Sequence, residues 1–394
     1  MPVLKSSDFS EELRKDLTAA HSLLNESDGN VLDVEQLEEQ PPTLLSSGIK
    51  FSSDPIFGIR TVAVKPGENI QQAIDLVNDR GGGTVVLMPG THNLIDNITM
   101  FAEISLVGFG QDESSTSQTI LDCNNGNYAV LCTSIKNFKI KDFTIQTSIA
   151  TAGVNITSCT NFELNKVQTL SCTGIGFRIV GSSDFSVVDC ISTNSESQGF
   201  RLGISLSGNS NCLFNNCKAT GSVGDGFLIQ DNINASFINC VSDANGAVGF
   251  TVNSTASTHS VAFLFCIASS NTGDGFEISI SPSSNFVLVG CSALNNTGIG
   301  YDAGSSTSIT AIGCFSSGNG GNDFAFASTR PSVAANFFRK GTPPSLWTTK
   351  PTNTSLYEGE IVPVRTASFK GLAARINGMT IYLNADASST TSST

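Results

Sequence analysis

The chain has 394 residues, only 14% of them charged, and a net charge of −13 at pH 7. This acidic balance, with no Lys/Arg cluster in the sequence, excludes nucleic acid and anionic membrane as favoured partners. The first residues, MPVLKSSDFSEELRKDL, lack the apolar core of a Sec signal, and no stretch reaches the ~18 apolar residues of a membrane span, so we expect synthesis in the cytoplasm and no membrane partner.

Residues 1–58 differ in composition from the rest of the chain. An amphipathic helix is expected at 8–24, with an apolar face formed by Phe9, Leu13, Leu17, Ala20 and Leu24. An acidic, proline-containing stretch at 26–42 is typical of a linker. Because an isolated helix of this length is marginal in water, we expect it to pack on its own chain, on a sister chain or on a larger particle.

A second amphipathic helix is expected within GENIQQAIDLVNDRGGGTVVLMPGTHNL, residues 67–94. Ile70, Ala73, Ile74 and Val77 recur at helical spacing and form one apolar stripe. If the chain that follows is a solenoid, this helix covers its open end, as terminal repeats must.

Residues 143–324 contain a repeat. Six cysteines are separated by 27, 23, 26, 25 and 23 residues, and an aromatic residue follows each cysteine after ten residues. The register extends backwards with Val167 and Phe177, and with Phe143 and Val154 at a spacing of eleven, so that eight coils align. The cysteines are Cys190, Cys217, Cys240, Cys266, Cys291 and Cys314, and the aromatic residues are Phe200, Phe227, Phe250, Phe276, Tyr301 and Phe324.

Each repeat predicts two short strands. Apolar or small residues alternate around the cysteine, and a second strand begins at the aromatic residue. Equivalent side chains of successive coils then stack at ~4.8 Å. We expect the cysteines to form an interior ladder of reduced thiols, because their Cβ vectors run parallel and their spacing does not fit zinc ligands. Asn245, Asn271, Asn296 and Asn319 are expected in tight turns that tolerate left-handed backbone.

Three segments carry a resemblance to a known family: 67–94, ITMFAEISLVGFGQ at 98–111, and TILD at 119–122. They resemble the N-terminal cap and first coils of the pectate-lyase (pectin-lyase-like) superfamily, a domain common in phage tailspikes and polysaccharide-degrading enzymes. The resemblance covers about 60–330 and implies an all-β fold, a right-handed single-stranded parallel β-helix with an N-terminal capping helix. The expected boundaries are 1–58 for a docking region, 59–335 for the β-helix and 336–394 for a C-terminal segment.

The C-terminal segment leaves the repeat. Residues 342–360 are expected to form a loop, 360–369 and 379–385 to form strands, and 387–394 to form a polar tail. In tailspike-like proteins such a segment often helps three copies to assemble. The resemblance therefore implies self-association as a homotrimer, incorporated in a virus or phage particle.

Outward residues of neighbouring coils form a candidate site. Asp225 and Asp274 lie two coils apart, which corresponds to ~9.6 Å and approaches the ~6.5–9.5 Å between the carboxylates of inverting glycosidases. The catalytic candidates are Asp225, Asp274 and Glu277. The substrate-binding candidates are Arg178, Arg201 and Asp302, with the arginines suited to an acidic sugar.

Two alternatives stay open at these positions. Asp225 and Asp274 lie in Gly-Asp-Gly turns, where an aspartate commonly bonds its own backbone. Glu277 and Asp302, on adjacent coils, offer oxygen ligands for Ca²⁺. The sequence itself predicts no metal site and no other cofactor.

Two functions from different classes fit this sequence. The first is a structural or attachment β-helix that contacts a glycan, a polysaccharide or neighbouring subunits. The second is a polysaccharide lyase or glycoside hydrolase. The Asp-Asp pair, Gly-His-Gly and Arg-x-Lys of polygalacturonases are missing from the sequence, and the acids are dispersed along it, which calcium-dependent pectate lyases do not show. These features favour the first function and leave open whether the chain is an enzyme.

Overall fold

The computed structural model describes residues 60–110, 118–123, 128–147, 151–204, 208–231, 233–254, 260–280, 285–304 and 309–326, and strands at 332–334, 337–339, 361–365, 370–376, 379–384 and 390–393. The expected helix at 8–24, the linker at 26–42 and the loop at 342–360 lie outside the described residues.

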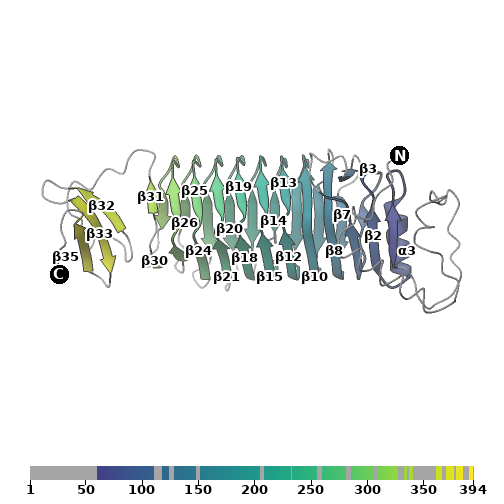
Figure 1. Ribbon diagram of the computed structural model, residues 1–394, viewed down its shortest axis with the longest axis horizontal. Coiled ribbons are helices and arrows are strands. Elements are labelled where there is room, and N and C mark those ends of the chain that lie inside the picture. Colours follow the sequence, from purple (N-terminus) through teal and green to yellow (C-terminus); the bar gives the residue numbers. More distant parts are fainter. Residues whose placement is uncertain are drawn as a thin grey trace, which may run out of the picture. The chain divides into compact units, whose positions relative to one another are not determined.

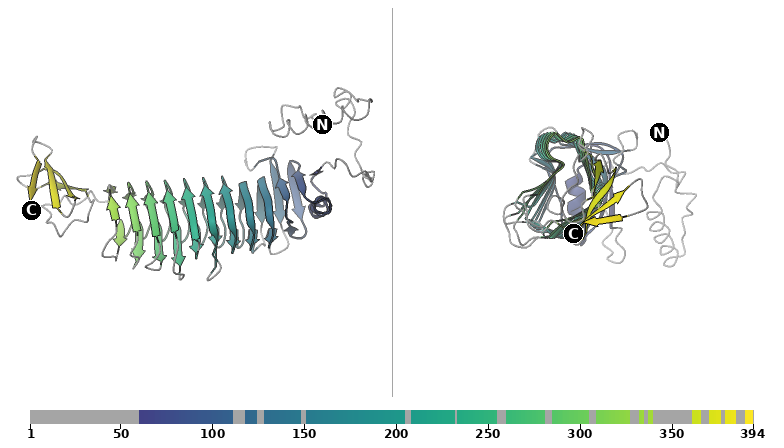
Figure 2. Two further views of the ribbon diagram at one scale, coloured as in Figure 1. Left: turned by 90° about the horizontal axis from the view of Figure 1, so that it is seen from below. Right: turned by 90° about the vertical axis from the view of Figure 1, so that its left-hand side faces the viewer.

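The described chain winds into a parallel β-helix with three strips of strands (Figure 1 and Figure 2). Sheet A contains two of the strips, which the long strands β8 (Lys136–Thr147) and β10 (Thr160–Leu170) join because they cross both. The first strip also contains β1 (Thr61–Val64), β2 (Gly83–Leu87), β5 (Ile104–Val107), β12 (Ser183–Val188), β15 (Ser210–Asn215), β18 (Ile233–Ile238), β21 (Ser260–Leu264), β24 (Asn285–Val289), β27 (Ile309–Ile312) and β30 (Ser332–Ala334).

The second strip of sheet A follows the first along every coil. It contains β3 (Gly90–Leu94), β6 (Thr119–Cys123), β13 (Ile191–Thr193), β16 (Lys218–Thr220), β19 (Val241–Asp243), β22 (Ile267–Ser269), β25 (Ser292–Leu294), β28 (Phe315–Ser317) and β31 (Phe337–Arg339). Sheet B forms the third side with ten parallel strands. They are β4 (Ile98–Thr99), β7 (Tyr128–Thr133), β9 (Ala152–Thr157), β11 (Ile175–Val180), β14 (Phe200–Leu202), β17 (Phe227–Gln230), β20 (Phe250–Ser254), β23 (Phe276–Ile280), β26 (Tyr301–Gly304) and β29 (Phe324–Phe326).

The strand register confirms the alignment of the repeat. Phe177 pairs with Phe200 and Phe200 with Phe227, each one coil further along the chain. The backward extension is also correct, since Val167 pairs with Phe143 and Phe177 with Val154. The spacing between cysteine and aromatic residue is fixed because the chain takes the same route from sheet A to sheet B in each of these coils.

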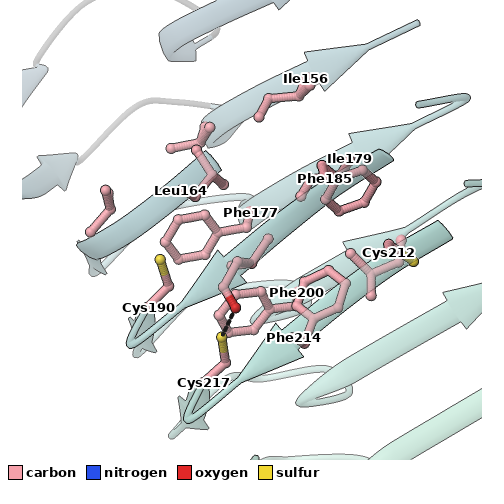
Figure 3. Close-up of a cluster of buried hydrophobic side chains, with 14 of the residues drawn as sticks. Ile156, Leu164, Phe177, Ile179, Phe185, Cys190, Phe200, Cys212, Phe214 and Cys217 are labelled. Carbon is pink, nitrogen blue, oxygen red and sulfur yellow. Dashed lines mark hydrogen bonds between the residues drawn. The ribbon is translucent and has the colours of Figure 1, made fainter. Parts of the chain in front are cut away.

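The cysteines lie inside the solenoid, as predicted. All eleven are buried and unpaired by disulfides. Figure 3 shows Cys190 beside Phe177, and Cys217 beside Phe200, with the Cys217 thiol donating to the Val187 carbonyl oxygen at 3.3 Å. Burial raises the pKa of the Cys190 thiol to about 12. The buried cysteines therefore behave as small apolar core residues.

The aromatic residues stack along the solenoid axis. The rings of Phe200, Phe227 and Phe250 are nearly parallel, with centroids 4.6 Å and 4.8 Å apart. This distance equals the spacing of hydrogen-bonded strands, so each ring rests on the ring of the next coil. A second set of rings on sheet A, which includes Phe214 and Phe237, meets the first edge-on.

The asparagine column differs from the prediction. Asn245, Asn271 and Asn296 are buried, and the left-handed residue of each turn is the one before them, as at Ser270 with φ 57°. The Asn271 side-chain oxygen accepts hydrogen bonds from the backbone and side-chain nitrogens of Asn245, at 3.1 Å and 3.0 Å. The column therefore serves as an interior hydrogen-bond ladder, which satisfies backbone groups that the turn leaves without partners.

Helix α3 (Ile70–Asp79) covers the N-terminal end of the solenoid, where it packs on β1 and β2 (Figure 1). The Asn69 side chain caps it by accepting from the Gln72 backbone at 3.1 Å. Its buried residues are those of the predicted stripe: Ile70, Ala73, Ile74 and Val77. In the part of the chain that the structure describes, no helix is long and apolar enough to cross a membrane.

The C-terminal segment contains a four-stranded antiparallel sheet. Its strands are β32 (Ile361–Arg365), β33 (Lys370–Ile376), β34 (Met379–Asn384) and β35 (Thr390–Ser393). Strands were expected at the first and third of these positions. The predicted polar tail is in part a strand, because β35 pairs with β34.

Candidate functional site

The outer face of sheet B carries one column of mostly polar residues, formed by the residue that follows each inward aromatic residue or, in the first of these coils, Val154. The alternation along a strand explains its position, because Phe177 and Ile179 point into the core and Arg178 between them points outward. The column contains, in order, Asn155, Arg178, Arg201, Leu228, Thr251, Glu277 and Asp302. Four of these seven residues, Arg178, Arg201, Glu277 and Asp302, are site candidates from the sequence.

The basic end of the column is the pair Arg178 and Arg201 on adjacent strands. Arg178 donates to the side-chain oxygen of Asn155 at 2.6 Å and to the Thr157 hydroxyl at 3.5 Å. The Nε atom of Arg201 is buried and has no hydrogen-bond partner. Burial lowers the pKa of Arg201, and the neighbouring Arg178 charge lowers it further. Two half-buried guanidinium groups therefore lie side by side with unused donors.

The two aspartates hold the turns that lead into sheet B. Asp225 accepts a hydrogen bond from the backbone of Val248 at 3.1 Å, and Asp274 accepts one from Ile299 at 2.6 Å. The expectation that each aspartate bonds its own backbone is therefore wrong, because the bond reaches the next coil. The glycines that follow fit the same turn, since a Cβ at Gly226 would lie 2.9 Å from the Gly249 carbonyl oxygen.

The acids gather at the other end of the column although they are dispersed in the sequence. Burial raises the pKa of Glu277, and the charges of Asp274, Asp225 and Asp302 raise it further. Burial also raises the pKa of Asp225 and of Asp274. Together these four carboxyl groups form an acidic cluster. Within the column, Leu228 and Thr251 lie between the arginines and Glu277, whereas Asp225 precedes Phe227 on the coil next to Arg201.

The arginines therefore occupy one end of the column, and Glu277 and Asp302 occupy the other. The structure brings Asp225, Asp274, Glu277 and Asp302 together, and it brings Arg178 and Arg201 together. Asp302, predicted to bind substrate with the arginines, lies with the acids instead. Sequence reasoning missed Asn155, which holds Arg178. The signal was present, because Asn155 follows Val154 as Arg178 follows Phe177.

Among the described residues, neither a metal site nor a hollow coincides with the predicted site residues. No group of three or more His, Cys, Asp and Glu side chains there is arranged to hold a metal ion. One hollow of about 590 Å³ lies at the start of α3, beside His92. Another of about 620 Å³ lies on sheet A, lined by residues that include Asn137, Asn161 and Asp184. Neither hollow contains a predicted site residue.

Comparison with known proteins identifies the fold. The family model described as "Right handed beta helix region" matches residues 128–281. A rhamnogalacturonan lyase superposes with a TM-score of 0.52 at 15% identity, over 70% of this chain and 87% of that chain. ORF18 of Geobacillus virus E2 gives 0.52 at 17% identity, over 81% of this chain and 68% of that one. Pectate lyase Pel9A gives 0.51 at 13% identity, over 72% and 76%.

At these identities the structural likeness shows the fold alone. A search of curated proteins gave no significant match. The predicted resemblance is confirmed at the level of the fold: this chain is a right-handed parallel β-helix similar to those of a pectate lyase, a rhamnogalacturonan lyase and a virus protein.

Proposed function

We propose that this chain is an attachment β-helix of a virus or phage particle, which binds an acidic glycan on the outer face of sheet B and assembles as a homotrimer. The observation that carries the glycan part is the pair Arg178 and Arg201. The virus protein ORF18, which has the same fold over 81% of this chain, supports the particle part.

The arginine pair suits an anionic ligand. Among the described residues, no carboxylate forms an ion pair with either guanidinium group, and the two positive charges repel each other. A guanidinium group recognises a carboxylate through two parallel hydrogen bonds. The carboxylate of a sugar acid would neutralise the pair.

The rest of the column suits a long chain ligand. Equivalent positions recur at every coil, about 4.8 Å apart, so the column offers donors or acceptors along the solenoid at every position except Leu228. The acidic cluster would repel the same anionic chain, which confines the ligand to the basic end and the neutral positions beside it. The aspartates serve the turns and need no catalytic role.

The test uses the full chain in affinity electrophoresis through gels that contain polygalacturonate or neutral dextran. We expect retardation by polygalacturonate and none by dextran, with no release of reducing ends or unsaturated products. Arg201→Gln should weaken binding about tenfold, since a hydrogen bond to a charged group contributes about 1.5–3 kcal/mol. The matched control is Lys218→Gln, which removes the same charge from sheet A and should leave binding unchanged. The absence of retardation by either polysaccharide would contradict the glycan part.

A second function, polysaccharide lyase or glycoside hydrolase, is favoured by one observation. A half-buried glutamic acid with a raised pKa, such as Glu277, keeps its proton to a higher pH than an exposed one and is suited to act as a general acid. Release of reducing ends that is lost in Glu277→Gln, with binding retained, would favour this function over attachment.

A further inference from the structure

The corner that joins the two strips of sheet A changes character along the solenoid. In the early coils its outward positions carry Lys141, Asn165 and Gln168, and Glu163 on the same strand forms ion pairs with Lys139 and Lys141. In the later coils the same columns are apolar except at Ser292, which lies between Ile267 and Phe315. We call these residues the apolar edge: Ile238, Val241, Leu264, Phe265, Ile267, Val289, Ile312 and Phe315.

The apolar edge is open to solvent at its most prominent residues. Phe265 is 58% exposed, Ile312 42% and Ile267 37%. The members come from consecutive coils in direct register, as in the row Ile238, Leu264, Val289 and Ile312, so they form a contiguous surface. A contiguous exposed apolar surface marks a site of interaction, whereas single apolar residues on a surface are ordinary.

Phe265, at this corner, has a backbone conformation that is unfavourable for a phenylalanine. Its φ is 57°, in the left-handed region, and the equivalent residues of the preceding coils are Asp189, Asn216 and Asn239, with φ between 52° and 54°. Aspartate and asparagine tolerate this conformation, while a bulky aromatic residue does so only at a cost. Strain of this kind is retained where a function requires the side chain.

The next coil makes room for the Phe265 ring. The equivalent residue there is Gly290, and a Cβ atom on Gly290 would lie 2.6 Å from Cδ1 of Phe265. Gly290 and Gly313 both have positive φ, so the turns after Phe265 carry no side chain at this position. The ring therefore projects from the corner over a smooth surface.

We propose that the apolar edge is the surface through which copies of this chain pack together in the assembly. This inference rests on the self-association in the proposed function and names the residues that mediate it. Charge argues for a second copy as the occupant, because two chains that each carry −13 repel least where neither carries charge. The residues that lie between its members, Asn239, Gly290, Ser292 and Gly313, carry no charge either. The coil spacing also favours a second copy. The side-chain rows of two identical chains have the same spacing, so they can interdigitate.

The test measures the mass of the full chain by sedimentation velocity across a range of micromolar concentrations. Wild-type protein is expected to form an oligomer of defined mass. Phe265→Asn should raise the concentration of half-dissociation at least tenfold, and the double variant with Ile312→Asn should be monomeric. Phe265→Asn copies the residue of the neighbouring coils, so it should keep or raise the melting temperature. A merely structural role of Phe265 would lower that temperature instead.

The matched control is Val223→Asn, which replaces an apolar side chain that is 65% exposed in the turn before sheet B and outside the apolar edge. This variant should remain oligomeric. A wild-type chain that stays monomeric, or an oligomer unaffected by the double variant, would overturn the inference. Retardation by polygalacturonate, measured separately on each variant, shows whether the glycan part of the proposed function stands or falls independently.

Discussion

The inside and the outside of sheet B follow opposite rules. Inside, one residue type recurs from coil to coil, as at Phe200, Phe227 and Phe250, whose rings stack at 4.6–4.8 Å. Outside, the adjacent column changes at almost every coil, and Leu228 is followed by Thr251. An interior side chain must fit its own copy one coil away, whereas an exterior side chain faces solvent or a ligand. Repetition therefore reports the fold, and departure from it reports function.

Removing one interior ring should lower the free energy of unfolding more than any other change proposed below. Phe250→Ala deletes a fully buried side chain that stacks on Phe227 and Phe276, and we expect a loss of about 3–5 kcal/mol in the free energy of unfolding. Val223→Ala, at an exposed position, should change it by less than about 0.5 kcal/mol. Urea unfolding followed by circular dichroism measures both. Equal losses in the two variants would show that burial does not govern the repeat.

A smaller loss is expected from the interior hydrogen-bond ladder. Asn271→Ala removes the acceptor of Asn245 and the side-chain donor to the Ser242 carbonyl, at 3.1 Å. The Asn245 side chain keeps the Ala219 carbonyl and the Ser242 hydroxyl as partners, but the buried backbone N–H of Asn245 loses its acceptor. One orphaned buried group costs about 1–3 kcal/mol, so the unfolding free energy should fall by about 2 kcal/mol. Thr272→Ala, at the exposed next position, is the matched control and should be nearly neutral. Increased amide hydrogen exchange at Asn245 in Asn271→Ala would place the damage at the expected coil.

The sequence predicted the interior far better than the exterior. Cysteines and aromatic residues at a fixed spacing define the register, because every coil crosses the same core. The asparagine ladder was misread, since composition marks Asn as a turn residue and does not show whether its side chain points inward. The site was predicted as a column of residues, but not as two separate groups. Which of those side chains approach one another depends on the direction in which the Asp225 and Asp274 side chains point from their turns. The spacing of residues in the sequence does not specify that direction.

If the aspartates stabilise their turns, removing the Asp225 carboxylate should lower the free energy of unfolding by about 1 kcal/mol or somewhat more. Asp225→Ala removes the acceptor of the Val248 N–H group and should lower the unfolding free energy by about 1–2 kcal/mol. Asp225→Asn keeps an acceptor oxygen of the same shape and should stay within about 0.5 kcal/mol of the wild type. Both variants should retain binding to polygalacturonate. Wild-type turnover of a polysaccharide that disappears in Asp225→Asn would instead make this carboxylate catalytic.

The smallest effect is expected at Glu277, an exterior residue whose charge is disfavoured by burial and by three neighbouring carboxylates. Its pKa is raised in the folded chain, so folding favours the protonated form, and the stability of the wild type falls as the pH rises from the ordinary value of 4.5 through the raised value. Glu277→Gln removes this loss. The variant should therefore exceed the wild type by about 0.2–0.5 kcal/mol at pH 7, a figure kept small by solvent screening. Because wild-type Glu277 is neutral at low pH, the difference should vanish near pH 3.5. Glu196→Gln, at an exposed turn, removes the same charge and should show no such pH-dependent gain. Melting temperatures across this pH range decide the matter, and a variant less stable than the wild type at pH 7 would mean that an unseen cation or ligand compensates the acidic cluster.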